Sequence, residues 1–270
     1  MIVGIDIGGT TTKIVGLGRD GTIAYATVKA SDPVASAAGA IGKFLAVAGK
    51  KMSDIDRLAV TGVGSTFIDK DILGIKVEHV EEFQAVGLGG LELSGAKRAL
   101  VVSVGTGTAI VHAEGRLARH VGGSGVGGGT ILGLGKALAG ISDFDNFALA
   151  ASKGCVENVD LTISDISSGA VGTLPPNATA SNFGKMADRP SPEDYAAGIV
   201  NMVFQTVGML AILAARAEGD TAIVIVGNTM QIPMAREILG ALYPVYGVKF
   251  IVPELAQYAT AMGAALFLKD

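Results

Sequence analysis

This sequence of 270 residues has few cysteines, few aromatic residues and no basic cluster. Cys155 is the only cysteine, and tryptophan is absent. One cysteine allows neither an internal disulfide nor a zinc site built from a cysteine cluster, so we expect Cys155 to be an ordinary, semi-buried residue. Aromatic residues make up only 5%, and 21 lysines and arginines face 25 acidic residues without forming a basic stripe. Nucleic acid is therefore not an expected partner.

A long uninterrupted apolar run is also missing, although 49% of the residues are hydrophobic. The most apolar stretch, 202–218, carries Gln205 near its start and Arg216 near its end, which makes it too short and too interrupted for a membrane span. We expect a buried helix there instead. The first strand is expected to begin at Ile2, with no basic segment and apolar core before it. These features predict a cytoplasmic protein without a membrane partner.

Hydrophobic periodicity predicts a mixed α/β protein. The expected strands are 2–7, 12–17, 23–29, 57–61, 76–80, 99–104, 108–113, 116–120, 222–226 and 249–252. The expected helices are 34–48, 83–93, 129–139, 143–152, 192–217, 233–243 and 256–267. The longest helix has a clear beginning, because Ser191 can cap it, Pro192 fits its first turn, and two acids follow.

The chain also repeats itself loosely. VGIDIGGTTTKIVGLGRDGTIAYATV near the beginning and ALVVSVGTGTAIVHAEGRLARHVGG further on both contain a strand, a Gly/Thr turn, a strand, a tight turn and a third strand. A chance match among glycine-rich hairpins is the alternative. The repeat predicts two related α/β domains, 1–96 and 97–270, with the boundary near SGAKR (94–98). A cleft between two such domains is a common place for a ligand.

The segment DIGGTTTK, residues 6–13, combines residue types that suit a bound phosphate. Glycine lets backbone amides approach an anion, threonine hydroxyls add donors, and lysine can neutralise phosphate charge. Asp6, at the end of a strand, can hold a hydrated Mg²⁺ ion. The residues assigned to the outer phosphates of ATP are Gly8, Gly9, Thr10, Thr11 and Lys13.

The segment VGTGT (104–108) offers the same amide and hydroxyl groups from the second unit. We assign Thr106, Gly107 and Thr108 to the phosphates of the same nucleotide, gripped from the opposite side. Two ordinary hairpin turns are the alternative interpretation. That interpretation would not explain why the acid, the lysine and the threonines occur together.

Two other phosphate-binding motifs offer alternatives to this interpretation. The P-loop pattern is absent, because no Gly-Lys-Ser/Thr occurs. A GxGxxG match at Gly123, Gly125 and Gly128 precedes an expected helix, and Asp143 lies at a suitable spacing for a ribose contact. This dehydrogenase alternative is weak, because chance matches are expected in a glycine-rich chain and because it leaves DIGGTTTK without a role.

The segment GGGTILGLG (127–135) has a simpler interpretation. Its glycines lead into the beginning of a helix, which can receive a nucleotide near its phosphates or sugar. Further on, VIVGNTM (224–230) ends a strand and offers a contact on the purine side. The nucleotide contacts assigned to these later parts of the chain are Gly128, Gly129, Thr130, Ile131, Leu132, Phe144 and Asn228.

These motifs carry a resemblance to a known family. DIGGTTTK and SVGTGT resemble the two phosphate loops of the superfamily that contains sugar kinases, heat-shock chaperones and actin. Within that superfamily the chain resembles the type II pantothenate kinases over nearly its whole length, in the run VEEFQAVGLGG, SVGTGT, RHVGGSGVGGGTILGLG, TASNFG, VGNT and YATAMGAALF. The resemblance implies an actin-like (ribonuclease H-like) fold of duplicated α/β domains, a homodimer, and phosphorylation of pantothenate from MgATP as the first step of coenzyme A biosynthesis.

The resemblance also implies catalytic residues. It places a general base at Glu82, which precedes Phe83-Gln84-Ala85, with Glu81 as the fallback and two exposed helix-start carboxylates as the alternative. The family has an arginine directly before VGG, placed to contact substrate or the transferred phosphate. This chain has His120 there and Arg119 one residue earlier. Because adjacent strand residues point to opposite faces, either Arg119 reaches the site through a local shift or His120 replaces it.

Three functions remain open from sequence. The first is a pantothenate kinase in which ATP lies in the cleft, Glu82 accepts the proton of the attacking hydroxyl, and Arg119 or His120 offsets charge on the transferred group. The second is another kinase of the same fold, acting on a sugar or hydroxy acid. The third is an ATPase switch or activator. Activators of this fold often carry cluster-binding cysteines, and only Cys155 could supply one here.

Overall fold

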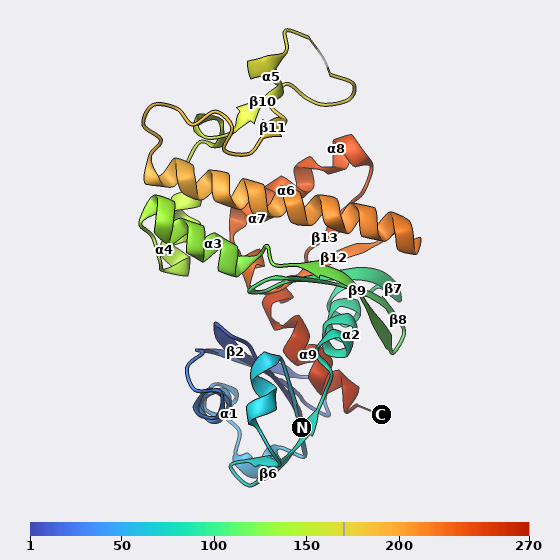
Figure 1. Ribbon diagram of the computed structural model, residues 1–270. Coiled ribbons are helices and arrows are strands. Elements are labelled where there is room, and N and C mark those ends of the chain that lie inside the picture. Colours follow the sequence, from blue (N-terminus) through green and yellow to red (C-terminus); the bar gives the residue numbers. More distant parts are fainter. Residues whose placement is uncertain (170, 270) are drawn as a thin grey trace.

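Two β-sheets stand one above the other in the computed structural model, which describes residues 1–169 and 171–269 (Figure 1). The first sheet has the strand order β3-β2-β1-β4-β6-β5. Its strands are β1 (Ile2–Ile7), β2 (Thr11–Leu17), β3 (Ile23–Lys29), β4 (Arg57–Thr61), β5 (Asp71–Ile72) and β6 (Ile75–His79). β1, β2 and β3 form an antiparallel meander, while β4 and β6 run parallel to β1.

The second sheet has the strand order β13-β12-β7-β8-β9. Its strands are β7 (Arg98–Val104), β8 (Thr108–Glu114), β9 (Leu117–Ser124), β12 (Ile223–Val226) and β13 (Phe250–Ile251). Here too three antiparallel strands are followed by two that run parallel to the first of them. The two sheets therefore have the same plan, with β5 added to the edge of the first, and the predicted repeat is present in the fold.

The described residues also form helices, several of which cover the faces of the two sheets. They are α1 (Pro33–Ala48), α2 (Glu82–Ser94), α3 (Gly128–Leu134), α4 (Phe144–Ala151), α5 (Ile163–Ile166), α6 (Pro192–Glu218), α7 (Pro233–Ala241), α8 (Tyr243–Tyr246) and α9 (Ala259–Phe267). α1 packs on the first sheet through Ala37, Ile41 and Phe44, which belong to the same buried cluster as the strand residues Ile5 and Ile14. α6 lies across the second sheet (Figure 1).

The helices α2 and α9 lie side by side between the two sheets (Figure 1). α2 packs mainly on β7, β8 and β9 of the second sheet, and α9 on β1, β2 and β4 of the first. Their backbones come so close that a Cβ on Gly263 would collide with the Ala85 carbonyl, and a Cβ on Gly89 with that of Ala259. The predicted domain boundary between residues 96 and 97 separates the strands of the two sheets. It does not separate the helices in the same way, because α2 precedes the boundary and packs on the second sheet, whereas α9 follows it and packs on the first.

The long helix α6 is the buried element that the apolar stretch predicted. It begins with the expected cap, in which Ser191 Oγ accepts a hydrogen bond from the amide of Asp194 at 3.1 Å. By length and composition it could span a membrane, so the expectation that this stretch is too short and too interrupted is wrong, but 67% of its most apolar window is buried inside the protein. Phe204, Val207 and Ile212 are fully buried in the core of the second sheet. The prediction of a buried helix is therefore confirmed.

A small subdomain sits on the side of α6 that faces away from the second sheet (Figure 1). It contains α5 and a two-stranded sheet of β10 (Leu161–Thr162) and β11 (Thr179–Ser181). Asp160, which is fully buried, anchors it by accepting hydrogen bonds from the Phe183 amide at 2.8 Å and from Asn201 Nδ2 of α6 at 2.7 Å. The sequence does not predict these elements, because the segment lacks a clear hydrophobic period.

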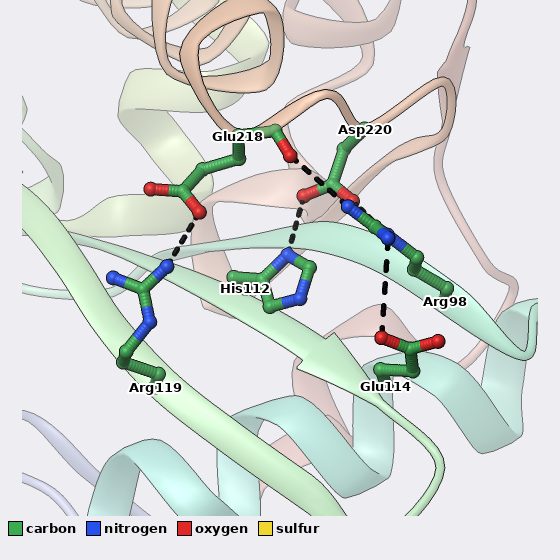
Figure 2. Close-up of polar contacts among 6 residues, drawn as sticks. All are labelled: Arg98, His112, Glu114, Arg119, Glu218 and Asp220. Carbon is green, nitrogen blue, oxygen red and sulfur yellow. Dashed lines mark hydrogen bonds and ion pairs between the residues drawn. The ribbon is translucent and has the colours of Figure 1, made fainter.

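A cluster of ionic contacts joins the C-terminal end of α6 to β7, β8 and β9 of the second sheet (Figure 2). The buried Asp220 carboxylate accepts a hydrogen bond from Arg98 Nε at 2.9 Å and contacts His112 Nδ1 at 2.8 Å. Arg119 of β9 forms an ion pair with Glu218 of α6. These contacts place Arg98, His112 and Arg119 on the face of the sheet that α6 covers.

Candidate active site

A cleft of about 320 Å³ lies between the two sheets and is lined by both Gly/Thr turns. Most residues that the sequence assigned to the nucleotide meet there. They are Asp6, Gly8, Gly9, Thr10, Thr11, Lys13, Thr106, Gly107, Thr108, Gly128, Leu132, Phe144 and Asn228, and Glu82 joins them. The two turns approach closely, because a Cβ on Gly9 would lie 3.8 Å from Thr106 Oγ1. The structure thus brings residues far apart in sequence to a single cleft.

The first turn connects β1 to β2, and its base is the pair Asp6 and Lys13. These two residues are direct partners in the antiparallel register, and Asp6 Oδ2 lies 3.8 Å from Lys13 Nζ. Burial raises the pKa of the Asp6 carboxyl, and the charge of Lys13 opposes that rise. The turn therefore presents a cation and a poorly solvated carboxylate to the same small space.

The second turn is held from behind by the segment that follows β9. The amides of Gly128 and Gly129 donate hydrogen bonds to the carbonyls of Gly105 and Thr106, both at 2.8 Å. Thr229 Oγ1 donates to the Val104 carbonyl, also at 2.8 Å. These bonds use the first amides of α3 to shape the second turn.

Three residues of the predicted α3 contact set do not line the cleft. The Gly129 amide donates a hydrogen bond to the Thr106 carbonyl, and Thr130 Oγ1 donates one to the Gly125 carbonyl at 3.2 Å. Ile131 is fully buried in the hydrophobic core, so its side chain is not part of the cleft lining. Gly128 and Leu132 do line the cleft. The beginning of α3 therefore mainly supports the second turn.

Glu82 is the first residue of α2 and lines the cleft, whereas Glu81 does not. Glu81 caps the helix, with its Oε2 accepting a hydrogen bond from the Gln84 amide at 2.8 Å. Burial raises the pKa of the Glu82 carboxyl, and the nearby negative charges of Asp6 and Glu81 raise it further. Of the two candidate bases, Glu82 has the suitable position and a perturbed carboxyl.

Arg119 and His120 occupy opposite faces of β9. Arg119 faces α6, where Glu218 holds its guanidinium away from the cleft (Figure 2). His120 faces α2, and its ring stacks on Phe83 with the ring centroids 4.1 Å apart. Neither residue lines the cleft, but only His120 lies beside the helix that carries Glu82. The pairing of β9 is regular from Leu117 to His120 and its register shifts only after His120, so no local shift brings Arg119 to the cleft.

The cleft also contains residues that the sequence analysis missed. Gly62 and Val63 follow β4, and Gln257 and Thr260 precede or begin α9. Gly62 has a φ of 84°, and a Cβ on it would lie 2.5 Å from Asp6 Oδ1. A glycine directly after a buried strand was a usable signal for Gly62. The sequence offers no comparable signal for Gln257, which reaches the cleft only because α9 packs on the first sheet.

One expectation from the sequence is wrong, and the weak dehydrogenase alternative finds no support. Cys155 is exposed, not semi-buried, and lies between α4 and the small subdomain. Gly123 belongs to β9, which pairs antiparallel to β8 at the edge of its sheet. A dinucleotide-binding fingerprint requires a parallel βαβ unit, so the GxGxxG match has no such role here.

Two sheets of the same plan, with glycine-rich turns facing one interdomain cleft, define the actin-like class of α/β proteins. The model of the Fumble family matches residues 92–239, more than half of the sequence, and the chain belongs to that family.

Known proteins agree with this assignment. The chain is 29% identical over 274 residues to a type II pantothenate kinase of Staphylococcus haemolyticus, covering 98% of each. It is 29% identical over 245 residues to a type II pantothenate kinase of Bacillus cereus, covering 84% of each. The crystal structure of (R)-2-hydroxyglutaryl-CoA dehydratase component A from Acidaminococcus fermentans matches with a TM-score of 0.69 and 23% identity, covering 98% of this chain and 96% of that one. At that identity the match shows the fold alone.

Proposed function

We propose that this protein is a pantothenate kinase, which transfers the γ-phosphoryl group of ATP to the terminal hydroxyl of pantothenate and so begins coenzyme A biosynthesis. The observation that carries the proposal is the meeting of both Gly/Thr turns with the Glu82 carboxylate in one cleft. The two relatives named above, with their pantothenate kinase names and coverage of 84–98%, support the choice of acceptor.

In the proposed reaction the first turn and Lys13 hold the outer phosphates from one side, and Thr106 to Thr108 hold them from the other. The oxygen of the acceptor hydroxyl forms a bond to the γ-phosphorus, and ADP leaves. Glu82 accepts the proton that this hydroxyl loses. The transition state of such transfers is loose, so positioning and electrostatic stabilisation contribute more than the base. The poor solvation of Glu82 favours proton uptake, because it raises the affinity of the carboxylate for a proton.

The cleft fits a magnesium ion that is bound mainly by the nucleotide. Across residues 1–169 and 171–269, no three His, Cys, Asp or Glu side chains gather as a metal site. Mg²⁺ commonly keeps several waters and takes one or two protein carboxylates together with substrate phosphates. Asp6, whose burial disfavours its charged form, is the residue we propose for this contact. Magnesium would supply charge neutralisation at the phosphates.

The location and assembly of the protein belong to the same proposal. We propose a cytoplasmic homodimer, in keeping with the resemblance to type II pantothenate kinases. Size-exclusion chromatography with light scattering tests the assembly at several protein concentrations. A monomer at all concentrations would contradict it.

The test of the function is ADP release by purified protein with MgATP and a panel of acceptors. The panel contains pantothenate, pantoate, pantetheine, N-acetylglucosamine, glucose and no acceptor. Turnover that depends on pantothenate is expected. Preference for another acceptor would keep the kinase and change its substrate. Equal ADP release with and without every acceptor would favour an ATPase switch and remove the kinase proposal.

A further inference from the structure

The Glu82 carboxylate has no hydrogen-bond or ion-pair partner among the side chains that the structure describes. Its position is therefore set by the first turn of α2, on which it sits. That turn has only one cap of its own, the Glu81 side chain on the Gln84 amide. What holds the turn in place determines where the proposed base stands relative to the phosphates.

Three neighbouring contacts fasten this turn to β9. Gln84 Nε2 donates a hydrogen bond to the Arg116 carbonyl, and Gln84 Oε1 accepts one from the Ala118 amide at 3.3 Å. The rings of Phe83 and His120 stack at 4.1 Å with only 11° between their planes. Ala118 and His120 of β9, and Arg116 just before this strand, thus contact the two residues that follow Glu82.

The packing further along α2 makes this approach possible. A Cβ on Gly87 would meet the Cβ atoms of Ala118 and Ala113, so the glycine allows α2 to lie directly on β8 and β9. In β9 the register shifts opposite Ile110 and Val111, so that His120 pairs with Val111 and Gly122 with Ile110. The bulge leaves His120 on the α2 face and still returns the strand to the cleft at Ser124, a lining residue.

We propose that His120 is a positioning residue whose ring, stacked on Phe83, works with Gln84 to hold Glu82 in register with the phosphate site. In this role the flat ring matters and the imidazole charge does not. β9 then joins the proposed base to the second phosphate turn, because the same strand carries the α2 contacts and ends at the cleft. This inference rests on the proposed kinase function and adds a role to it.

Steady-state kinetics of single-residue variants, compared with a matched control variant, test the proposal. We expect His120→Ala, Phe83→Leu and Gln84→Ala each to lower kcat by about 10- to 100-fold, the scale of a misplacement near 1 Å, with little change in the KM for ATP. His120→Phe keeps a flat ring and is expected to recover most of the loss. Leu117→Ala is the matched control, because Leu117 lies on the same strand, is highly exposed and takes no part in these contacts.

Several outcomes would overturn the proposal. Equal losses for His120→Phe and His120→Ala would mean that the imidazole charge or its hydrogen bonds act directly. A raised KM for ATP with unchanged kcat in His120→Ala would make the residue a phosphate contact. Wild-type rates in all three variants would mean that the turn needs no such support.

A spectroscopic measurement separates this proposal from the function on which it rests. The chain has only three histidines, so their imidazole proton signals can be assigned by substitution. The His120 signals are expected at high field because of the Phe83 ring, and to move toward ordinary positions in Phe83→Leu. Inactivity of the wild type toward pantothenate would remove the proposed function. Signals that do not change in Phe83→Leu would remove the stacking contact itself.

Discussion

Asp6 and Lys13 are cross-strand partners at the base of the first turn, 3.8 Å apart and almost buried. The pair joins a carboxylate that burial makes reluctant to ionise to a cation that favours its ionisation. A buried pair of this kind loses more when one member is removed than its own attraction is worth, because the remaining charge is left without a partner.

Removal of Lys13 is therefore expected to weaken ATP binding. Lys13→Ala should raise the dissociation constant for ATP by about 10- to 100-fold, since hydrogen bonds to charged groups contribute about 1.5–3 kcal/mol. Lys29→Ala is the control, because Lys29 is exposed on β3. Isothermal titration calorimetry with the two variants gives the comparison. Unaltered ATP affinity and rate in Lys13→Ala would refute the phosphate role of the first turn.

Substitution of Glu82 tests the proposed base. Glu82→Gln should lower kcat by about a hundredfold or more, while ATP still binds, because the amide cannot accept the hydroxyl proton. Glu81→Gln is the matched variant, since its side-chain oxygen can still cap the Gln84 amide. Steady-state ADP release and ATP titration measure both effects. A large loss in Glu81→Gln together with normal turnover in Glu82→Gln would reverse the assignment.

The raised pKa of Glu82 predicts the pH dependence of the rate. The base acts in its ionised form, so kcat/KM should fall as pH drops through the pKa of Glu82, at a pH above the ordinary range of a glutamate. Glu81 is one of the charges that raise this pKa. Glu81→Gln should therefore move the acidic limb to lower pH. The measurement is kcat/KM as a function of pH for the wild type and for Glu81→Gln. If the acidic limb stays at the same pH in both, Glu82 does not govern it.

The contact between α2 and α9 predicts an effect on stability. Gly263→Ala should lower the free energy of unfolding by about 1–3 kcal/mol, because the new Cβ would overlap the Ala85 carbonyl. Gly42→Ala in α1 is the opposite case, since a Cβ there meets no atom within 4 Å. That variant should gain about 0.5–1 kcal/mol. Urea unfolding measures both, and equal stability of the two variants would contradict the close helix contact.

The sequence predicted the parts of this fold that depend on local pattern. β1, β3 and β4 have the predicted bounds, because each is a short stretch rich in β-branched and other apolar residues. The helix predicted at 129–139 is regular only in α3 and continues as a π-helix at Gly135–Ala139. Gly135 packs against the Phe147 ring there, a contact from another helix that no local pattern reveals.

The candidate site shows the same limit. Glycine, threonine and charged residues close together in sequence predicted two phosphate-binding turns. The structure brings both turns to one cleft, and their role in phosphate binding stays a prediction. The roles of Gly128 and Gly129 could not be predicted from residue types in the sequence. Their amides have partners in Gly105 and Thr106, which only the folded chain brings within reach. The partners of Arg119 and His120, Glu218 and Phe83, likewise come from helices that only the folded chain brings to β9.

The packing of α9 has a consequence for biosynthesis. On the first sheet, a Cβ on Gly4 of β1 would collide with the backbone of α9 at Ala261, so the helix lies directly on this strand. The ribosome completes α9 only after all strands of both sheets have been made. Until α9 has been made, the apolar face of the first sheet that this helix covers stays exposed to solvent. The two halves should therefore acquire their final structure together and not one after the other.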